Sequence, residues 1–240
     1  MVKFTIDGRE VMAEEGSMIL DVAKANNIYI PALCAHESVT PYGACRLCIV
    51  EVTKNGRTKI VTSCLYPVEE GIEVKTNTDR IKSNRKILME LLLARSPESE
   101  VIQEMAERLG VESTPFEVEE HGNCILCALC TRVCEEVVGV SAISLVNRGV
   151  NREVAIPFYD NSDACIGCGS CAYVCPTGAI TLEDKGDTRT ITMPKNKTAF
   201  KLAKCKVCGR YWIPQKQIEY ISKKTEIPAD FFDTCTDCRD

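Results

Sequence analysis

The sequence predicts an α+β protein built from several small modules, each organised around a group of cysteines. Sixteen of the 240 residues are cysteine, and they fall into four groups of four along the chain. Strand-like alternation with one helix-like segment dominates the N-terminal third, and a cysteine-free stretch with helical periodicity follows it. Modules this small bury little apolar surface, so we expect bound metal to stabilise them.

A small α/β module is expected over residues 1–78. Residues 2–6 and 10–13 alternate like strands around the turn Asp7-Gly8. Ser17 is the predicted N-cap of a helix that runs through residue 26. Further strands are predicted at residues 48–53, 59–64 and 72–76.

Residues 79–119 are predicted to be a helical spacer without metal ligands. The apolar spacing indicates one helix over residues 79–94, which ends near Ser96-Pro97, and a second over residues 98–109. No cysteine occurs in this stretch. We therefore expect it to set the distance between metal-binding modules.

Residues 120–185 contain an internal duplication, because C-x2-C-x2-C-x3-C begins at Cys124 and again at Cys165. In ferredoxins with two clusters, the fourth cysteine of each motif binds the cluster of the other motif. A ferredoxin-like module with two [4Fe–4S] clusters is expected. A pair of zinc sites is the alternative, but a loop with three cysteines suits a cubane better than one ion. The predicted ligands are Cys124, Cys127, Cys130 and Cys175 for the first cluster, and Cys165, Cys168, Cys171 and Cys134 for the second.

Residues 186–240 are predicted to form a small zinc-ribbon-like tail. A polar loop is expected over residues 184–197 and a helix over residues 215–224. Two C-x2-C pairs, Cys205 with Cys208 and Cys235 with Cys238, are separated by 26 residues. Gly209 permits the tight turn around a metal, and this spacing is typical of zinc ribbons. A fourth iron–sulfur cluster is the alternative, since the same thiolates can hold either metal.

The first group of cysteines lies in PALCAHESVTPYGACRLCIVEV and VTSC. These segments resemble the [2Fe–2S] module shared by three proteins: the complex I large iron–sulfur subunit, the diaphorase small subunit of NAD-linked nickel–iron hydrogenases, and the N-terminal part of iron-only hydrogenases. CILCALCTRVCEEV and CIGCGSCAYVCPTGAI resemble the two [4Fe–4S] motifs of the same families. The resemblance covers roughly residues 1–185. It implies a β-grasp fold over residues 1–78 and a [2Fe–2S] cluster on Cys34, Cys45, Cys48 and Cys64.

One cluster of those families is missing from this sequence. They carry a further [4Fe–4S] cluster, bound by one histidine and three cysteines, after a leucine-rich helix. That helix is present here as ILMELLLARSP, but Ser96 stands where the histidine is expected, and no cysteine lies between Cys64 and Cys124. Of the two histidines present, His36 and His121, neither is predicted to be a ligand, because four thiolates already serve each cluster.

Other classes of protein fit the composition poorly. A disulfide framework is disfavoured by the repeated C-x2-C spacing and by the polar N-terminal segment, which does not resemble a signal peptide. The net charge of −5 mixes both signs and predicts no nucleic-acid partner. No apolar run reaches the roughly 18 residues that span a membrane. A cytoplasmic location is expected.

The leading functional hypothesis is a non-catalytic electron-transfer subunit of an NAD(P)-linked oxidoreductase. No G-x-G-x-x-G follows a predicted strand, so a nicotinamide or flavin site is not expected here. The resemblance implies an NADH- and FMN-binding diaphorase-type partner and a catalytic subunit of hydrogenase or formate dehydrogenase type, with ferredoxin as a further partner. The missing cluster favours a divergent hydrogenase, including an electron-bifurcating one. A free-standing polyferredoxin and a structural zinc protein are the alternatives.

Overall fold

The computed structural model describes residues 1–118, 123–159 and 163–239. It divides into two compact units, Met1–Ala128 and Leu129–Asp240. Both units combine β-sheets with short helices, which confirms the α+β class. The module boundaries proposed above stay predictions.

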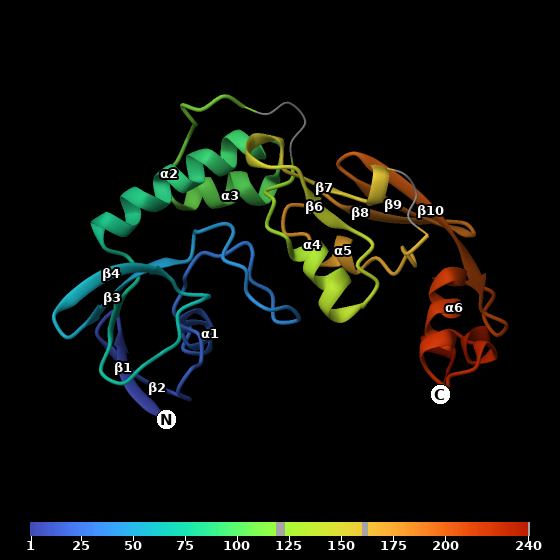
Figure 1. Ribbon diagram of the computed structural model, residues 1–240, viewed down its shortest axis with the longest axis horizontal. Coiled ribbons are helices and arrows are strands. Elements are labelled where there is room, and N and C mark those ends of the chain that lie inside the picture. The colour runs from blue at the N-terminus through green and yellow to red at the C-terminus, as the bar shows by residue number, and fades with distance from the viewer. Residues whose placement is uncertain (119–122, 160–162, 240) are drawn as a thin grey trace. The chain divides into compact units, whose positions relative to one another are not determined.

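The first unit contains a five-stranded sheet with one helix against it (Figure 1). The strand order is β2-β1-β5-β3-β4, with β1 parallel to β5 and the other neighbours antiparallel. The elements are β1 (Val2–Ile6), β2 (Arg9–Ala13), α1 (Ile19–Ala25), β3 (Ile49–Lys54), β4 (Arg57–Thr62) and β5 (Glu73–Lys75).

Alternation of apolar residues forms this sheet, because every second side chain of a strand faces the same side. Phe4 and Ile6 of β1 are buried with Val50 and Val52 of β3 in one core. At the end of β1, the Asp7 carboxylate accepts hydrogen bonds from the backbone N–H and the hydroxyl of Thr76, at 2.8 and 2.6 Å. These bonds fix the parallel pairing of β1 with β5.

The predicted start of the first helix is wrong by one residue. The N-cap of α1 is Met18, and no side chain caps the helix. Met18 also forms a β-bridge with Pro67, and Ser17 O accepts from Val68 N at 2.8 Å. This pairing with a segment far along the chain holds Met18 extended, so the helix begins after it. Local capping preferences do not include such long-range contacts.

Two helices follow the sheet and lie side by side in Figure 1: α2 (Asp79–Arg95) and α3 (Glu100–Arg108). The Thr78 hydroxyl caps α2 by accepting from Ile81 N at 3.2 Å. Met89 of α2 and Ile102 of α3 are fully buried. Ser96, which ends α2, is also fully buried, so the position of the missing histidine lies inside the helical pair.

The second unit begins with short elements around the duplicated cysteine motif. Within its described residues, a two-stranded antiparallel sheet pairs β6 with β7. The elements are α4 (Leu129–Arg132), the π-helix η1 (Val133–Val137), β6 (Ser144–Val146), the 3₁₀-helix η2 (Gly149–Asn151), β7 (Glu153–Ala155), the 3₁₀-turn η3 (Pro157–Tyr159) and α5 (Ser170–Tyr173).

A four-stranded antiparallel sheet of order β11-β10-β9-β8 completes the second unit, together with α6. In Figure 1 it is the orange sheet from which the chain continues into α6. The elements are β8 (Thr181–Lys185), β9 (Thr188–Met193), β10 (Asn196–Lys204), β11 (Tyr211–Pro214), α6 (Gln215–Lys224) and the 3₁₀-helices η4 (Ala229–Asp233) and η5 (Thr236–Cys238).

The predicted loop over residues 184–197 is wrong, because β8, β9 and the start of β10 occupy it. The side chains of β8 are all exposed, so its sequence lacks the alternation that indicates a half-buried strand. Ile191 and Met193 of β9 are buried and anchor the hairpins. Among the described residues, no helix is both long and apolar enough to cross a membrane.

Candidate metal centres

The first group of four cysteines lies where the loop between α1 and β3 meets the five-stranded sheet. Cys34 and Cys45 lie in the loop between α1 and β3, Cys48 directly precedes β3, and Cys64 follows β4. All four are buried, with exposed fractions of 6% or less. The backbone supports them, since Ser63 N donates to Cys48 O at 3.0 Å and joins the two cysteine-bearing segments.

These four thiols form two hydrogen-bonded pairs. Cys48 Sγ and Cys64 Sγ are 3.4 Å apart. Cys34 Sγ accepts from Cys45 N at 3.4 Å, and the two side chains also share a hydrogen bond. In each pair the shared hydrogen bond lowers the pKa of one thiol, Cys45 or Cys48, to about 6. It raises the pKa of the partner, Cys34 or Cys64.

Two pairs are the arrangement that a [2Fe–2S] cluster requires. Each of its two irons takes two thiolates, so ligands of one iron lie close together and the two pairs lie farther apart. A single tetrahedral ion would instead draw all four sulfurs to one point. The pairing of Cys34 with Cys45 and of Cys48 with Cys64 therefore fits a binuclear centre.

The two copies of the duplicated motif share an unusual backbone conformation. In the second copy, Gly167 and Gly169 have φ of +72° and +83°. In the first copy, Leu126 and Ala128 occupy the same positions and have φ of +53° and +65°. Residues with a Cβ rarely adopt this conformation. The duplication therefore extends to the path of the main chain around the cysteines.

Cys134 lies with the cysteines of the second copy. The pKa of Cys171 is raised to about 12, first by burial and then by the neighbouring Cys168, Cys165 and Cys134. Burial also raises the pKa of Cys165 and of Cys134, and the charge of Cys168 acts on each of them. Ala142 N donates to Cys134 Sγ at 3.2 Å. These four are the predicted ligands of the second [4Fe–4S] cluster, an assignment that stays a prediction.

Two of the predicted ligands of the first [4Fe–4S] cluster, Cys124 and Cys175, make contacts with nearby residues. At the end of α2, Arg95 Nε donates to Cys124 O at 3.3 Å. Cys127 and Cys130 are buried on either side of Leu129, where α4 begins. Cys175 follows α5, and its sulfur lies 3.9 Å from the Thr177 hydroxyl. This ligand set also stays a prediction.

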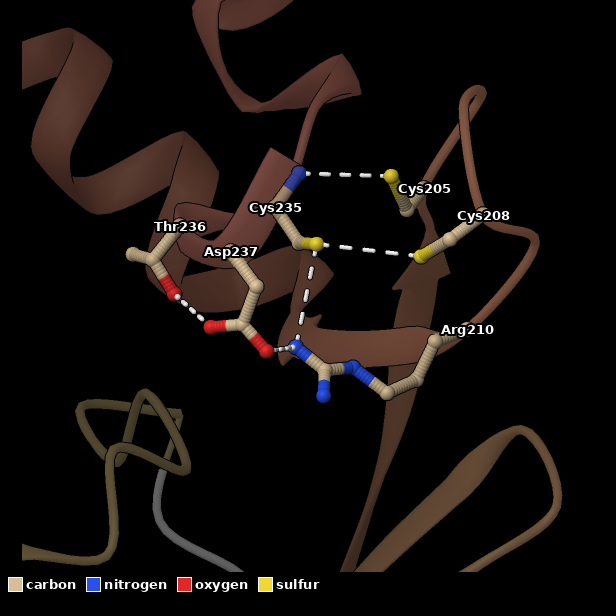
Figure 2. Close-up of polar contacts among 6 residues, drawn as sticks. All are labelled: Cys205, Cys208, Arg210, Cys235, Thr236 and Asp237. Carbon is tan, nitrogen blue, oxygen red and sulfur yellow. Dashed lines mark hydrogen bonds and ion pairs between the residues drawn. The ribbon is translucent and has the colours of Figure 1, made fainter. Parts of the chain in front are cut away.

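The tail brings its four cysteines to one point. The sulfur atoms of Cys205, Cys208, Cys235 and Cys238 all lie within 4.8 Å of one another. Figure 2 shows Cys205 and Cys208 facing Cys235, with 3.8 Å between the sulfurs of Cys208 and Cys235. In a tetrahedral site with metal–sulfur bonds of about 2.3 Å, the sulfurs are about 3.8 Å apart. Within the described ranges, no other group of three or more such ligands is as compact.

Hydrogen bonds to sulfur stabilise the thiolate form of Cys205, whereas the hydrogen bonds that Cys238 shares with Cys235 and Cys208 raise its pKa to about 12. Backbone N–H groups, first that of Cys208 and then that of Cys235, donate to Cys205 and lower its pKa to about 6. The Arg210 guanidinium donates to Cys235 Sγ at 3.7 Å and to the Asp237 carboxylate at 2.6 Å (Figure 2). Gly209 has φ of +76° and its N–H donates to Cys205 O, as the predicted turn requires. Sequence spacing did not indicate the role of Arg210.

Of the two histidines, the structure describes His36. His36 Nδ1 accepts a hydrogen bond from Ser38 N at 3.2 Å, in the loop that carries Cys34. His121 lies outside the described residues. The prediction that neither histidine is a ligand therefore stays a prediction.

Comparison with protein families matches both cysteine-rich regions. Residues 1–79 match a 2Fe-2S iron-sulfur cluster binding domain, and residues 123–179 match a 4Fe-4S dicluster domain. A second 4Fe-4S dicluster domain family matches residues 157–211. The chain therefore contains domains of both iron–sulfur types.

Several curated proteins share sequence with three quarters of the chain. The NADP-reducing hydrogenase subunit HndD of Solidesulfovibrio fructosivorans is 35% identical over 211 residues, which cover 75% of this chain and 36% of that protein. The alpha subunit of the NADPH-Fe(3+) oxidoreductase of Geobacter sulfurreducens is 32% identical over 75% of this chain and 24% of its own length. The mitochondrial 78 kDa subunit of the NADH-ubiquinone oxidoreductase of Candida albicans is 30% identical over 75% of this chain and 28% of its own length. The chain thus spans about a quarter to a third of these relatives.

A solved structure with a similar fold is the NAD+-reducing [NiFe]-hydrogenase in the H2-reduced state. The TM-score is 0.58 and the identity 28%, over 65% of this chain and 75% of that chain. Together with the curated relatives, this match confirms the resemblance to subunits of NAD(P)-linked hydrogenases and of the NADH-ubiquinone oxidoreductase.

Proposed function

We propose that this chain is an electron-relay subunit of a multi-subunit NAD(P)-linked oxidoreductase. The observation that carries the proposal is the presence, in one chain, of a paired set of four buried cysteines and a duplicated motif with one shared backbone conformation. These fit a binuclear and two cubane centres. When bound, such clusters accept and release single electrons. The similarity to subunits of three NAD(P)-linked oxidoreductases supports this function.

The proposed [2Fe–2S] site uses the cysteine pairs of the first unit. A β-grasp fold for residues 1–78 is supported by the mixed sheet with α1 against it and by the domain match over residues 1–79. The sheet holds Cys48 and Cys64 at the ends of two paired strands, and the loop supplies the other pair. The proposed ligands are Cys34, Cys45, Cys48 and Cys64.

The proposed [4Fe–4S] sites use the crossed arrangement of the duplicated motif. The electrostatic proximity of Cys134 to the cysteines of the second copy supports the crossing. The 4Fe-4S dicluster match over residues 123–179 contains all eight residues. The proposed ligands are Cys124, Cys127, Cys130 and Cys175 for one cluster, and Cys165, Cys168, Cys171 and Cys134 for the other.

We propose that the tail holds one zinc ion on Cys205, Cys208, Cys235 and Cys238. The mutual sulfur distances support a single ion, because a cubane of irons and sulfides would keep the four thiolates farther apart. Tetrahedral thiolate sites in proteins favour zinc. Since zinc has no redox chemistry, this site would fasten the tail and would leave the relay to the other twelve cysteines.

The proposed partners are an NADH- and FMN-binding diaphorase-type subunit and a catalytic subunit. Among catalytic subunits we favour a hydrogenase, including an electron-bifurcating one that also uses ferredoxin, over a formate dehydrogenase. The similarity to a hydrogenase subunit and to a hydrogenase structure supports this order. We place the complex in the cytoplasm, where thiols stay reduced and available for metal.

Native mass spectrometry of the protein isolated from its host tests the subunit role. We expect the chain to be detected in a complex with a flavin-containing partner and a catalytic subunit. Electron paramagnetic resonance of the complex reduced with NADH should then show both [2Fe–2S] and [4Fe–4S] signals. A fully loaded monomer without partners would contradict the subunit role and favour a free-standing polyferredoxin.

A further inference from the structure

Arg85 is a buried cation that the relay described so far does not use. It lies on α2, one helix turn from the fully buried Ile81, and is only 5% exposed. The guanidinium group keeps its proton under all ordinary conditions. A buried charge that lacks an opposite charge costs several kcal/mol. The fold must therefore supply something that offsets this cost.

Both hydrogen bonds of Arg85 go to the segment that carries Cys48. Arg85 Nε donates to Leu47 O at 3.0 Å, and Arg85 Nη2 donates to Ile49 O at 2.7 Å. These carbonyls belong to the residues immediately before and after the cysteine. The guanidinium fork therefore fixes the main chain on both sides of Cys48.

These partners are neutral, so they satisfy the hydrogen-bond donors but leave the charge uncompensated. Within the described parts of the chain, no carboxylate forms an ion pair with Arg85. The negative groups that act on its charge are Cys48 first, and then Tyr29 and Asp7. Burial alone lowers the pKa of Arg85, and these groups oppose that effect. The strongest of them is a proposed cluster ligand.

The proposed cluster supplies the missing charge. Each thiolate ligand carries one negative charge, and a [2Fe–2S] centre with four thiolates is an anion in both oxidation states. Reduction adds one electron and makes it more negative. A fixed cation nearby stabilises the reduced form more than the oxidised form, because attraction grows with the product of the charges.

We infer that Arg85 is the buried counter-charge of the [2Fe–2S] cluster, a positioning residue that holds the Cys48 segment and raises the reduction potential of that cluster. The inference rests on the proposed function, since it requires the cluster on Cys34, Cys45, Cys48 and Cys64. The step it affects is the uptake of one electron by the cluster, with no bond made or broken in the protein.

A redox titration of the full chain, monitored by electron paramagnetic resonance, tests this role. The variants are Arg85→Gln and Arg85→Lys, and the matched control is Lys86→Gln, which removes an exposed charge from the next position of the same helix. In Arg85→Gln we expect the reduced-to-oxidised ratio of the [2Fe–2S] cluster at a fixed potential to fall about tenfold, or about 59 mV for one electron. Arg85→Lys should stay close to the wild type, and Lys86→Gln should not change. The [4Fe–4S] signals serve as an internal reference.

An unchanged [2Fe–2S] potential in a fully loaded Arg85→Gln chain would overturn the inference and leave the proposed function intact. A wild-type chain without any [2Fe–2S] signal would contradict the proposed function itself. If Arg85→Gln fails to hold the cluster, cluster content replaces the potential as the measured quantity. Retention of the cluster in Arg85→Lys then supports the charge, and equal loss in both variants overturns it.

Discussion

At the scale of single residues, the duplicated motif depends on backbone conformations that suit glycine. Gly167 has positive φ, and a Cβ built on it would lie 2.6 Å from the ring of Phe200 on β10. Such a distance is shorter than any ordinary contact between these atoms. Glycine is therefore favoured at position 167 for two reasons: its backbone has positive φ, and the ring of Phe200 leaves no space for a Cβ. Leu126 at the matching position of the first copy shows that the conformation alone can be tolerated.

The first prediction concerns Gly167→Ala. We expect the free energy of unfolding to fall by about 3 kcal/mol, because the left-handed conformation costs an alanine about 1–2 kcal/mol and overpacking against Phe200 adds about 1–3 kcal/mol. Gly178→Ala is the matched control, since Gly178 has φ of +67° with open space around it. Urea unfolding of the loaded chain measures both. Equal losses in the two variants would contradict the role of the Phe200 contact.

At the residue level, the sequence predicted the grouping of the tail cysteines, which the structure brings together, and did not indicate the arginines around the cysteine groups. Cysteine spacing predicted the two duplicated groups and the tail group, because the chemistry of a metal centre restricts the spacing of its ligands, whereas the first group was assigned from the family resemblance. Arg85 bonds to carbonyls 38 and 36 residues away, and Arg210 reaches a sulfur 25 residues away. No local pattern carries such long-range contacts. For Arg85, the only signal in the sequence is its position between Ile81 and Met89, which lie four residues away on the same helix face.

At the scale of elements, one arginine joins the hairpin of β8 and β9 to its surroundings. Arg189 donates two hydrogen bonds of 2.8 Å to the Asp184 carboxylate. It also donates to Gly167 O and Trp212 O, at 3.3 and 3.5 Å. One side chain therefore connects the second cysteine motif, the hairpin and β11.

The second prediction is that Arg189→Ala lowers the free energy of unfolding by about 1.5–3 kcal/mol, the range for hydrogen bonds to charged groups. Lys201→Ala is the control. It removes an exposed partner of Asp187 from the same sheet and should cost no more than about 1 kcal/mol. Thermal unfolding under anaerobic conditions compares them, and a loss for Lys201→Ala as large as for Arg189→Ala would argue against the connecting role.

The contribution of the Arg189–Asp184 ion pair to stability should depend on pH with a definite sign. The Arg189 hydrogen bonds hold the pKa of the Asp184 carboxyl below its ordinary value of 3.8. The ionised carboxylate therefore stabilises the fold fully at pH values above the ordinary pKa. The stabilisation is lost as the pH falls through the lowered pKa. The difference between the wild type and Asp184→Asn should therefore be constant from about pH 8 to about pH 5. A steady decline across that interval in urea unfolding would contradict the lowered pKa.

A further prediction concerns zinc binding by the tail. In Cys208→Ser we expect the bound zinc to fall from one ion per chain to much less, because one of four thiolates is lost. The iron content should not change. Val207→Ser alters the exposed neighbour and should keep both metals. Metal analysis of the purified variants decides this, and loss of iron in Cys208→Ser would place an iron centre in the tail instead.

Prediction of whole elements worked where one face of the element is buried. β1, β3 and α2 were predicted within two residues of their ends, because apolar side chains repeat with the period of a strand or a helix. The hairpin β8–β9 was missed, since exposed strands with polar side chains lack that period. Its stability comes instead from strand pairing and from Arg189, which only the folded structure reveals.

At the scale of the whole molecule, the proposed function separates redox chemistry from structural metal binding. Twelve cysteines form paired or duplicated groups that fit multi-iron centres, and four form a compact group that fits one ion. The spacer of α2 and α3 contributes no cysteine, and the buried Ser96 stands where the family resemblance implies a histidine ligand. The proposed relay therefore lacks the histidine-bound cluster that the resemblance implies.

Elemental analysis of the anaerobically purified full chain tests this division most directly. Two [4Fe–4S] clusters, one [2Fe–2S] cluster and one zinc ion predict about ten irons and about one zinc per chain. About fourteen irons without zinc would contradict the structural role of the tail. A colourless protein that holds only zinc would contradict the electron relay.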